Sequence, residues 1–555
     1  MQKAVRSKPS TMYFKNQKSI YQCSICNKEY SQQSNCIKHI HKHDFEISNT
    51  SFSNFQYNGN YIQKQTENLL LWRCAHGIAM QAICDPLFRS LFAPHVIQSD
   101  KTNQRISNDM CTQILHMNFQ KTSERYISLI LDGGTVAHNK WIAIGYNYRS
   151  GEKVHFQVLD MRVFQKSTAS DIKNLIDGIS ERIKNVYDGR VVATCRDNAA
   201  NFKKAFLSIN SDVDEQNPDD FIPLNILSVS CACHTAQLAL KDLYSVVEGY
   251  RDLIENMKAI QSKITFLSKA DFDRLKIGFY PRLQSQRWNS AYNVLCYIIN
   301  HLDGISKLFQ QDETFSLRID ELCQLQKELA PVYVFTCMCE PDNANQATIF
   351  IAYRALEARY QVINTFRAKK ILELILVQFN TTADLELARL CFYTTNAGIR
   401  EKQDKYPHIS LANITSEEEA RRYHEETNFL KSFREIISKV CIIVEMNFEV
   451  IFDAFQYLLQ HYKPSNDNVE GFPKLIDLNE TFKNYGKGEF AYVKLSQFIE
   501  ILQILPASEA SAERVFARMR DIHSTLQTNQ TAETLRTEII LSFHAEEARK
   551  LGTIE

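Results

Sequence analysis

ILPASEASAERVFARMRD, residues 504–521, is the stretch on which the fold of this chain depends. Pro506 opens a turn, and Ser508 or Ser511 is placed to cap the helix that follows. Apolar residues recur there at spacings of three and four, which predicts one apolar face: Val515, Phe516, Met519 and Ile522. Glu513 lies on the first turn beside that face. Its carboxylate either complements the helix dipole or joins acidic residues that occur much earlier in the chain.

Those earlier acidic residues are Asp132 and Asp197, each of which we expect to end a strand. A carboxylate at a strand end is exposed while its backbone stays rigid. Together with Glu513 they could hold two divalent ions roughly 4 Å apart, and Mg²⁺ or Mn²⁺ suits an all-oxygen site. Two alternatives stay open, because Asp132-Gly133-Gly134 is also a good hairpin turn and Asp197-Asn198 a good helix cap. Spacing alone does not decide between them.

The pattern around these residues predicts an α/β domain with a mixed sheet. Three β-rich runs are followed by a helix, a strand, a helix, a strand and a further helix. In order these are 126–134, 140–149, 155–164, 169–187, a strand ending at Asp197 with its helix, and a strand ending near Cys231 with its helix. From about 246 to 480 the pattern is mainly helical and shows no repeat.

Composition excludes some classes of function. The chain has 555 residues and a formal net charge of zero, so no global electrostatic argument favours nucleic acid. Its 15 cysteines are scattered singly, which suits a reducing compartment. No secretory segment and no bilayer-spanning apolar run is present in the sequence, so we expect an intracellular protein without a membrane partner.

The N-terminal segment is locally basic and contains metal-ligand spacing. Its pattern is C-x2-C-x12-H-x3-H, the spacing of a ββα zinc finger, with Zn²⁺ held by Cys23, Cys26, His39 and His43. A hairpin knuckle presents two thiolates, and one helical turn places two imidazoles on the same face. The alternative is chance spacing in a tail. A finger that docks in the usual way would read bases with Gln32, Asn35 and Lys38, which are otherwise solvated helix residues.

Taken together, the chain resembles the hAT superfamily of DNA transposases. The likeness is carried by an ordered series of motifs that covers nearly the whole chain after the polar residues 46–66. They are the N-terminal finger (in the place of a BED-type finger), LLLWRCAHGIAMQAICDPLFRSLF, ISLILDGGT with WIAIGYNY, CRDNAANF, CACHTAQLAL, QRWNS and PASEASAERVFARMR. The chain departs from the usual pattern at Gly134, where the family often has Trp, and at Ala517, where a Ser is common.

The resemblance implies a DDE triad of Asp132, Asp197 and Glu513 that binds magnesium or manganese. Cys231 and His234 match a C-x-x-H pair near the family's active site. His234 would help bind the scissile phosphate, although a packed strand-to-helix junction explains the pair equally well. Trp288 matches a tryptophan that stacks on DNA, and Arg287 beside it is placed to contact phosphate.

The implied architecture is an RNase H-like catalytic core interrupted by a large all-α insertion, preceded by the ββα finger and a small helical module. The expected domains are a finger with a basic arm, a linker, a helical DNA-binding or dimerisation module, the first part of the core, the insertion, and core completion with a dimerisation region. Their expected ranges are 1–45, 46–66, 67–125, 126–245, 246–480 and 481–555.

The function that the resemblance implies is cut-and-paste DNA transposition in the nucleus, with transposon ends and target DNA as partners and a homodimer or higher homo-oligomer as the assembly. The alternative is a domesticated nuclear zinc-finger protein that binds DNA without catalysis. Retention of all three acidic positions favours the enzyme, since a binding protein has no physical need of them.

Overall fold

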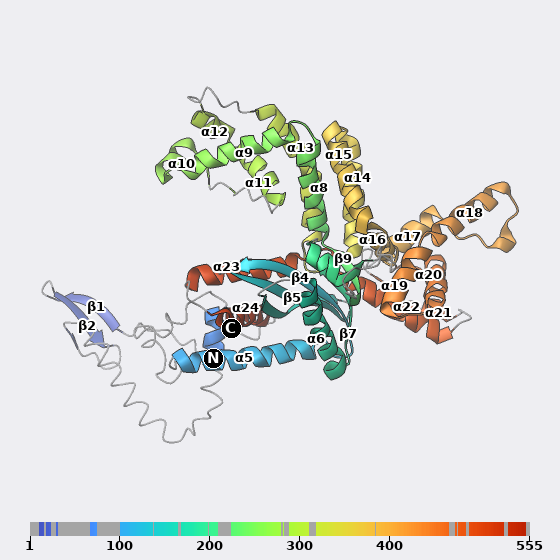
Figure 1. The fold of residues 1–555 in the computed structure, drawn as a ribbon, viewed down its shortest axis with the longest axis horizontal. Helices are drawn as coiled ribbons and strands as arrows, with labels where there is room; N and C mark the ends of the chain where they lie inside the picture. The colour runs from blue at the N-terminus through green and yellow to red at the C-terminus, as the bar shows by residue number, and fades with distance from the viewer. Residues whose placement is uncertain are drawn as a thin grey trace, which may run out of the picture. The chain divides into compact units, whose positions relative to one another are not determined.

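The computed structural model divides the chain into two compact units (Figure 1). One comprises Met1–Arg73 and Ala79–Ile106, with Ile554; the other comprises Cys74–Ile78 and Ser107–Thr553, with Glu555. The residues that the structure describes are 10–15, 18–23, 29–30, 67–74, 100–136, 138–151, 153–164, 168–197, 199–208, 224–278, 281, 288–309, 318–382, 384–464, 472–473, 475–483, 488–526 and 531–550. Among them, no helix is long and apolar enough to cross a membrane.

The first unit contains a small antiparallel sheet of β1 (Ser10–Lys15), β2 (Lys18–Cys23) and β3 (Glu29–Tyr30). β2 and β3 pair with Tyr21 opposite Tyr30, so the backbone of Cys23 ends the strand that enters this hairpin. The metal-ligating and base-reading side chains expected from the sequence lie outside the described residues: Cys23, Cys26, His39, His43, Gln32, Asn35 and Lys38. Residues 67–74 are helical, and α5 (Asp100–Gln120) leads into the second unit.

A mixed sheet with the strand order β6-β5-β4-β7-β9-β8 organises the second unit. β4 (Tyr126–Val136), β5 (Asn139–Ser150) and β6 (Lys153–Phe164) are successively antiparallel. β7 (Arg190–Arg196) runs parallel to β4, and β9 (Leu224–Ser230) runs parallel to β7. The mixed α/β class predicted from the sequence is confirmed. The edge strand β8 (Phe206–Ser208), which pairs with β9, was not predicted; it has only three residues and no alternation to read.

The sheet is covered on both faces, and strand alternation decides which residue meets which helix. Ile127, Leu129 and Leu131 of β4 pack on one face against α6 (Ala169–Tyr187). Thr168 and Asp171 cap α6 reciprocally, which is why its observed bounds equal the predicted ones. The side chains of β4 at the alternate positions face the opposite side, where α23 (Ala510–Leu526) lies on β4 and β5, while α24 (Ala532–Lys550) contacts β6. α7 (Ala200–Ala205) follows β7.

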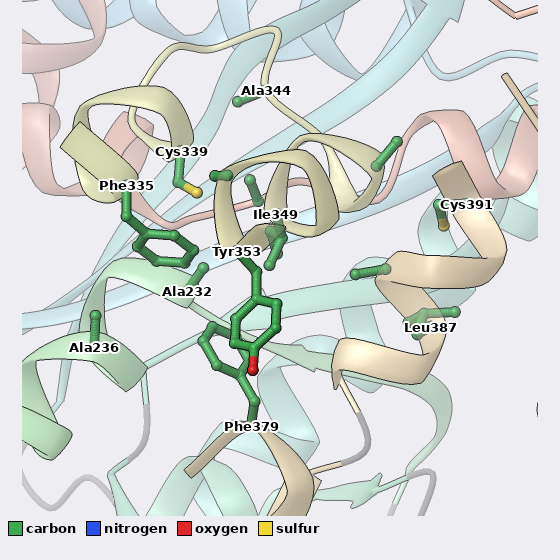
Figure 2. Close-up of a cluster of buried hydrophobic side chains, with 14 of the residues drawn as sticks. Ala232, Ala236, Phe335, Cys339, Ala344, Ile349, Tyr353, Phe379, Leu387 and Cys391 are labelled. Atoms are coloured by element: carbon green, nitrogen blue, oxygen red, sulfur yellow. The ribbon is translucent and has the colours of Figure 1, made fainter. Parts of the chain in front are cut away.

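The chain between β9 and α23 is helical in its described part, as the sequence predicted. α8 (Ala232–Val246), α13 (Ile319–Cys339), α14 (Gln346–Ile363) and α15 (Phe366–Thr382) share one apolar core; Figure 2 shows Phe335, Tyr353 and Phe379 gathered within it. The other helices are α9 (Tyr250–Thr265), α10 (Lys269–Leu275), α11 (Trp288–Asn300), α12 (Leu302–Phe309), α16 (Asp384–Tyr393), α17 (Asn396–Lys405), α18 (Glu417–Lys431), α19 (Arg434–Val444), α20 (Phe448–His461), α21 (Leu475–Phe482) and α22 (Gly488–Gln503).

A buried ion pair joins α17 to α18 in this helical region. The Lys402 ammonium, fully buried, lies 2.6 Å from a carboxylate oxygen of Glu426, itself 2% exposed. Glu426 also lies 3.2 Å from Nδ1 of His408 and accepts the backbone N–H of Ile409. Both charges are therefore compensated, but removal of one partner leaves the other buried without compensation.

Glu426→Ala is expected to lower the free energy of unfolding by about 3–5 kcal/mol, because Lys402 would keep its buried charge without a partner. The matched control is Glu418→Ala on the same helix; Glu418 pairs with Arg422 at the surface, where the expected loss is under about 1 kcal/mol. Urea unfolding followed by far-ultraviolet circular dichroism measures both. Equal losses in the two variants would contradict the assigned role of Lys402.

Candidate active site

The helix predicted from residues 504–521 is α23, and its apolar face is present: Val515, Phe516, Met519 and Ile522 are all buried. The capping prediction is only partly right. Ser508 Oγ accepts the backbone N–H of Ala510, whereas Ser511 lies inside the first turn and donates to the Asp342 carboxylate. Arg514 pairs with the same carboxylate. The start of α23 is thus held by side chains of the helical region as well as by its own turn.

The extended residues before α23 are fixed on one side by the turn between α13 and α14. The backbone N–H of Ala507 donates to the carbonyl of Ala344 at 3.1 Å, and the backbone N–H of Gln346 donates to the carbonyl of Leu505 at 3.1 Å. The Gln346 side chain donates to the Pro506 carbonyl at 2.8 Å, and Ser508 Oγ donates to the carbonyl of Cys339 at 2.8 Å. All these groups are buried or part-buried, so each bond that is lost leaves a polar group without water. Cys339 and Ala344 are labelled in Figure 2.

On the other side, the same residues are joined to the end of β9. The Ala232 N–H donates to the Ala507 carbonyl at 3.0 Å. The Cys231 sulfur, fully buried, accepts two backbone N–H groups at 3.5 Å, one from His234 and one from Glu509. Cys231 therefore caps α8 and attaches the start of α23 to the sheet at once. This finding fits the packed-junction interpretation of Cys231, while His234 beside it is partly exposed.

Asp132 lies on β4, and Asp197 directly follows the neighbouring strand β7. The parallel pairing of the two strands, which lie about 4.8 Å apart, ends at Leu131 opposite Arg196, and each aspartate is the residue after that last pair. The expectation that Asp132 ends its strand is wrong, and so is the hairpin turn at Gly133-Gly134. β4 continues to Val136 because its other edge stays paired with β5, with Asp132 opposite Ala143.

β7 ends at Arg196, so Asp197 follows the strand directly, one residue beyond its last position, and part of the capping alternative is also present. Its Oδ1 accepts the backbone N–H of Ala199 at 2.9 Å, just before α7. The neighbouring Arg196 is buried; it donates to Ser228 Oγ at 2.8 Å and to the Asp197 carbonyl at 3.0 Å. Asp197 thus stands on a backbone fixed from both sides, with one carboxylate oxygen engaged locally.

Both of the other acidic residues influence the charge of Asp132. Burial, together with the negative charges of Asp197 and Glu513, raises the pKa of Asp132 to about 8. The Gly133 N–H and the Arg520 guanidinium act in the opposite direction. The carboxyl groups of Asp132 on β4, Asp197 after β7 and Glu513 on α23 are therefore near enough for their charges to repel one another.

Close packing of α23 on β4 explains this approach. A Cβ atom on Gly134 would lie 2.9 Å from the ring of Phe516, so only glycine lets the helix come so near. Glu513, Phe516 and Arg520 recur along α23 at spacings of three and four, the spacing of one helix face. Gly134 has the same strand parity as Asp132, which confirms that this face of α23 lies over the aspartate.

Glu509 is a residue of this site that sequence reasoning missed. It is 8% exposed, and burial together with the charges of Cys231, Asp132, Asp197 and Glu513 raises its pKa well above the ordinary value. Its Oε1 lies 3.9 Å from His234 Nδ1. The signal that could have found it is its position four residues before Glu513, on the same side of the helix start.

The chain matches no protein-family model and no curated protein sequence. The assignment of this site therefore depends on its own geometry. Within the described ranges, no three His, Cys, Asp or Glu side chains are grouped as a ready metal site. The expected DNA contacts Arg287 and the side chain of Trp288 lie outside the described residues; the backbone of Trp288 begins α11.

The donor set nevertheless fits a divalent cation. Three carboxylates from separate elements supply oxygen ligands, which Mg²⁺ and Mn²⁺ prefer. The raised pKa of Asp132 reflects burial and surroundings with more negative than positive charge. In addition, Glu509 Oε2 is buried without a hydrogen-bond partner among the described residues. A cation would relieve both conditions.

Asp132→Asn is expected to stabilise the metal-free protein at alkaline pH. A carboxyl whose pKa is raised from 3.8 to about 8 on folding contributes stability that is complete below about pH 4 and is lost as the pH rises to about 8. Asparagine cannot ionise and removes that loss. Thermal unfolding in a chelator at pH 5 and pH 9 measures the difference, with Glu533→Gln on α24 as the exposed control. A variant that is less stable than the parent at pH 9 would contradict the repulsion inferred here.

Proposed function

We propose that this protein is a metal-dependent DNA-cleaving and strand-transferring enzyme, a cut-and-paste transposase of the hAT type. The observation that carries the proposal is the electrostatic coupling of Asp132 to both Asp197 and Glu513. These residues are far apart in the sequence, and a protein that only binds DNA gains nothing by gathering three negative charges that repel phosphate.

The sheet supports an RNase H-like core as part of the same proposal. Three antiparallel strands come first, and the parallel strands β7 and β9 are added at the edge of β4. The two aspartates stand on the central neighbours β4 and β7, and the glutamate comes from α23. The helical region between α8 and α23 then corresponds to an insertion between the second and third acidic residues.

In the proposed mechanism Asp132, Asp197 and Glu513 would hold a pair of Mg²⁺ or Mn²⁺ ions. When bound there, such ions activate water or a 3′-hydroxyl and stabilise the leaving oxygen of a phosphodiester. The two aspartates supply fixed ligands from the sheet, whereas Glu513 supplies an exposed one from the helix. His234 would donate a hydrogen bond to a phosphate oxygen.

DNA recognition is assigned to other parts of the chain. The zinc finger and its basic arm would recognise element ends, with Gln32, Asn35 and Lys38 facing bases. Trp288 would stack on a base near the cleavage point, and Arg287 would contact phosphate there. Assembly as a homodimer and action in the nucleus belong to the same proposal.

Asp132→Asn, Asp197→Asn and Glu513→Gln are each expected to reduce DNA cleavage by about 10³-fold or more, while DNA affinity stays within about threefold. Each change removes a charged ligand and leaves the fold. The substrate is a duplex that carries the genomic sequences flanking the coding region, assayed with Mn²⁺, and Glu533→Gln is the control. Cleavage that survives in all three variants would disprove the assigned roles. Binding without any cleavage by the parent protein would favour the domesticated, non-catalytic alternative.

Cys26→Ser is expected to weaken sequence-specific binding to that duplex, because a zinc finger that loses a thiolate does not hold its fold. Binding to DNA of scrambled sequence should change much less. Fluorescence anisotropy with both duplexes measures the ratio. The finger has no part in end recognition if the ratio is the same in the parent and the variant.

A further inference from the structure

Glu509 and His234 form a carboxyl–imidazole pair near the acidic residues Asp132, Asp197 and Glu513. Oε1 of Glu509 lies 3.9 Å from Nδ1 of His234, which is an ion-pair distance but longer than a hydrogen bond. A small side-chain movement would therefore join the two groups.

The backbone beneath this pair is fixed. The Cys231 sulfur accepts the N–H groups of both His234 and Glu509, so one buried atom sets the separation of the two residues. His234 lies on the first turn of α8, and Glu509 directly precedes α23. Whatever displaces one residue of the pair also displaces the other.

Burial of the Glu509 carboxyl group lowers the stability of the fold unless a partner compensates it. The residue is 8% exposed, and its Oε2 atom has no hydrogen-bond partner among the described residues. A buried polar group without a partner destabilises the folded state. An apolar residue at this position would avoid that cost, and Ala510 and Ala512 show that small apolar residues fit the same segment.

The exposure of the two side chains is unequal. The His234 side chain is 32% exposed, whereas that of Glu509 is 11% exposed. The imidazole is therefore accessible to a ligand from solvent, whereas the carboxyl group of Glu509 is largely enclosed. An enclosed carboxyl group beside an accessible imidazole is the arrangement expected when the carboxyl group orients the imidazole.

We propose that Glu509 is a positioning residue for His234. Its carboxyl group accepts a hydrogen bond from Nδ1–H of His234, so that Nε2 of His234 is directed to a phosphate oxygen of the DNA near Asp132, Asp197 and Glu513. The inference rests on the proposed function, since it names the group that orients a phosphate-binding residue of that site. The experiments below distinguish a failure of this inference from a failure of the proposed function, because the first measurement needs neither DNA nor metal.

The first experiment is ¹⁵N imidazole spectroscopy of the full chain in a chelator, with the His234 signals assigned by their loss in His234→Asn. The parent protein and Glu509→Gln, whose amide oxygen still accepts a hydrogen bond, are expected to show the Nδ1–H form of His234. Glu509→Ala should lose it. If the ring nitrogens of His234 have the same shifts in Glu509→Ala as in the parent, the positioning role is disproved.

The second experiment measures cleavage of the flanking-sequence duplex. Glu509→Ala and His234→Asn are each expected to lower kcat by about 10- to 100-fold with KM little changed, and the double variant should lose no more than the larger single loss. Glu509→Gln should retain most of the activity. Losses that multiply in the double variant would overturn the pair, since they would show that the residues act separately.

Mn²⁺ binding by titration distinguishes positioning from a fourth metal ligand. Glu509→Ala is expected to bind Mn²⁺ as the parent does, while Asp132→Asn binds it more weakly. Weaker Mn²⁺ binding in Glu509→Ala would make Glu509 a ligand and overturn the inference. If the parent protein does not cleave at all, the proposed function fails, and the spectroscopic result still decides whether Glu509 orients His234. Thermal unfolding shows that each variant is folded.

Discussion

The double attachment of residues 505–509 is the constraint on which the rest of the structure depends. These few residues bond to the end of β9 through Ala507 and Cys231, and to the turn between α13 and α14 through Gln346 and Ser508. α23 begins directly after them. The position of Glu513 over the sheet is consequently set by the helical region and the sheet together, and neither part alone fixes it.

Repulsion between buried carboxyl groups opposes this geometry. Asp132 and Glu509 are drawn out of water next to further carboxylates, and the pKa of each is raised by burial before any like charge is considered. Such a cluster destabilises the fold by itself, and packing elsewhere must compensate. The contact of Gly134 with Phe516 is one such place: the absent side chain lets the helix pack closely enough to bring the charges together.

The sequence was sufficient where local rules agree. α6 has a reciprocal cap and a clear apolar face, so its bounds were predicted fully, and the apolar face of α23 followed from spacing. It was insufficient where partners are distant. Asp132 lies inside β4 because β5 extends the pairing beyond it, which no local pattern shows. Glu509 resembles an ordinary acidic residue before a helix; only the fold reveals that it is buried beside His234.

The attachment of residues 505–509 also has a consequence for biosynthesis. Asp132 and Asp197 leave the ribosome early, but their partner on α23 follows only after the entire helical region has been made. The turn between α13 and α14, to which residues 505–509 bond, can be complete by then, so the last segment binds to a region that has already been made. A nascent or prematurely terminated chain that ends before Ala510 lacks Glu513. The set of acidic residues Asp132, Asp197 and Glu513 is therefore complete only late in translation.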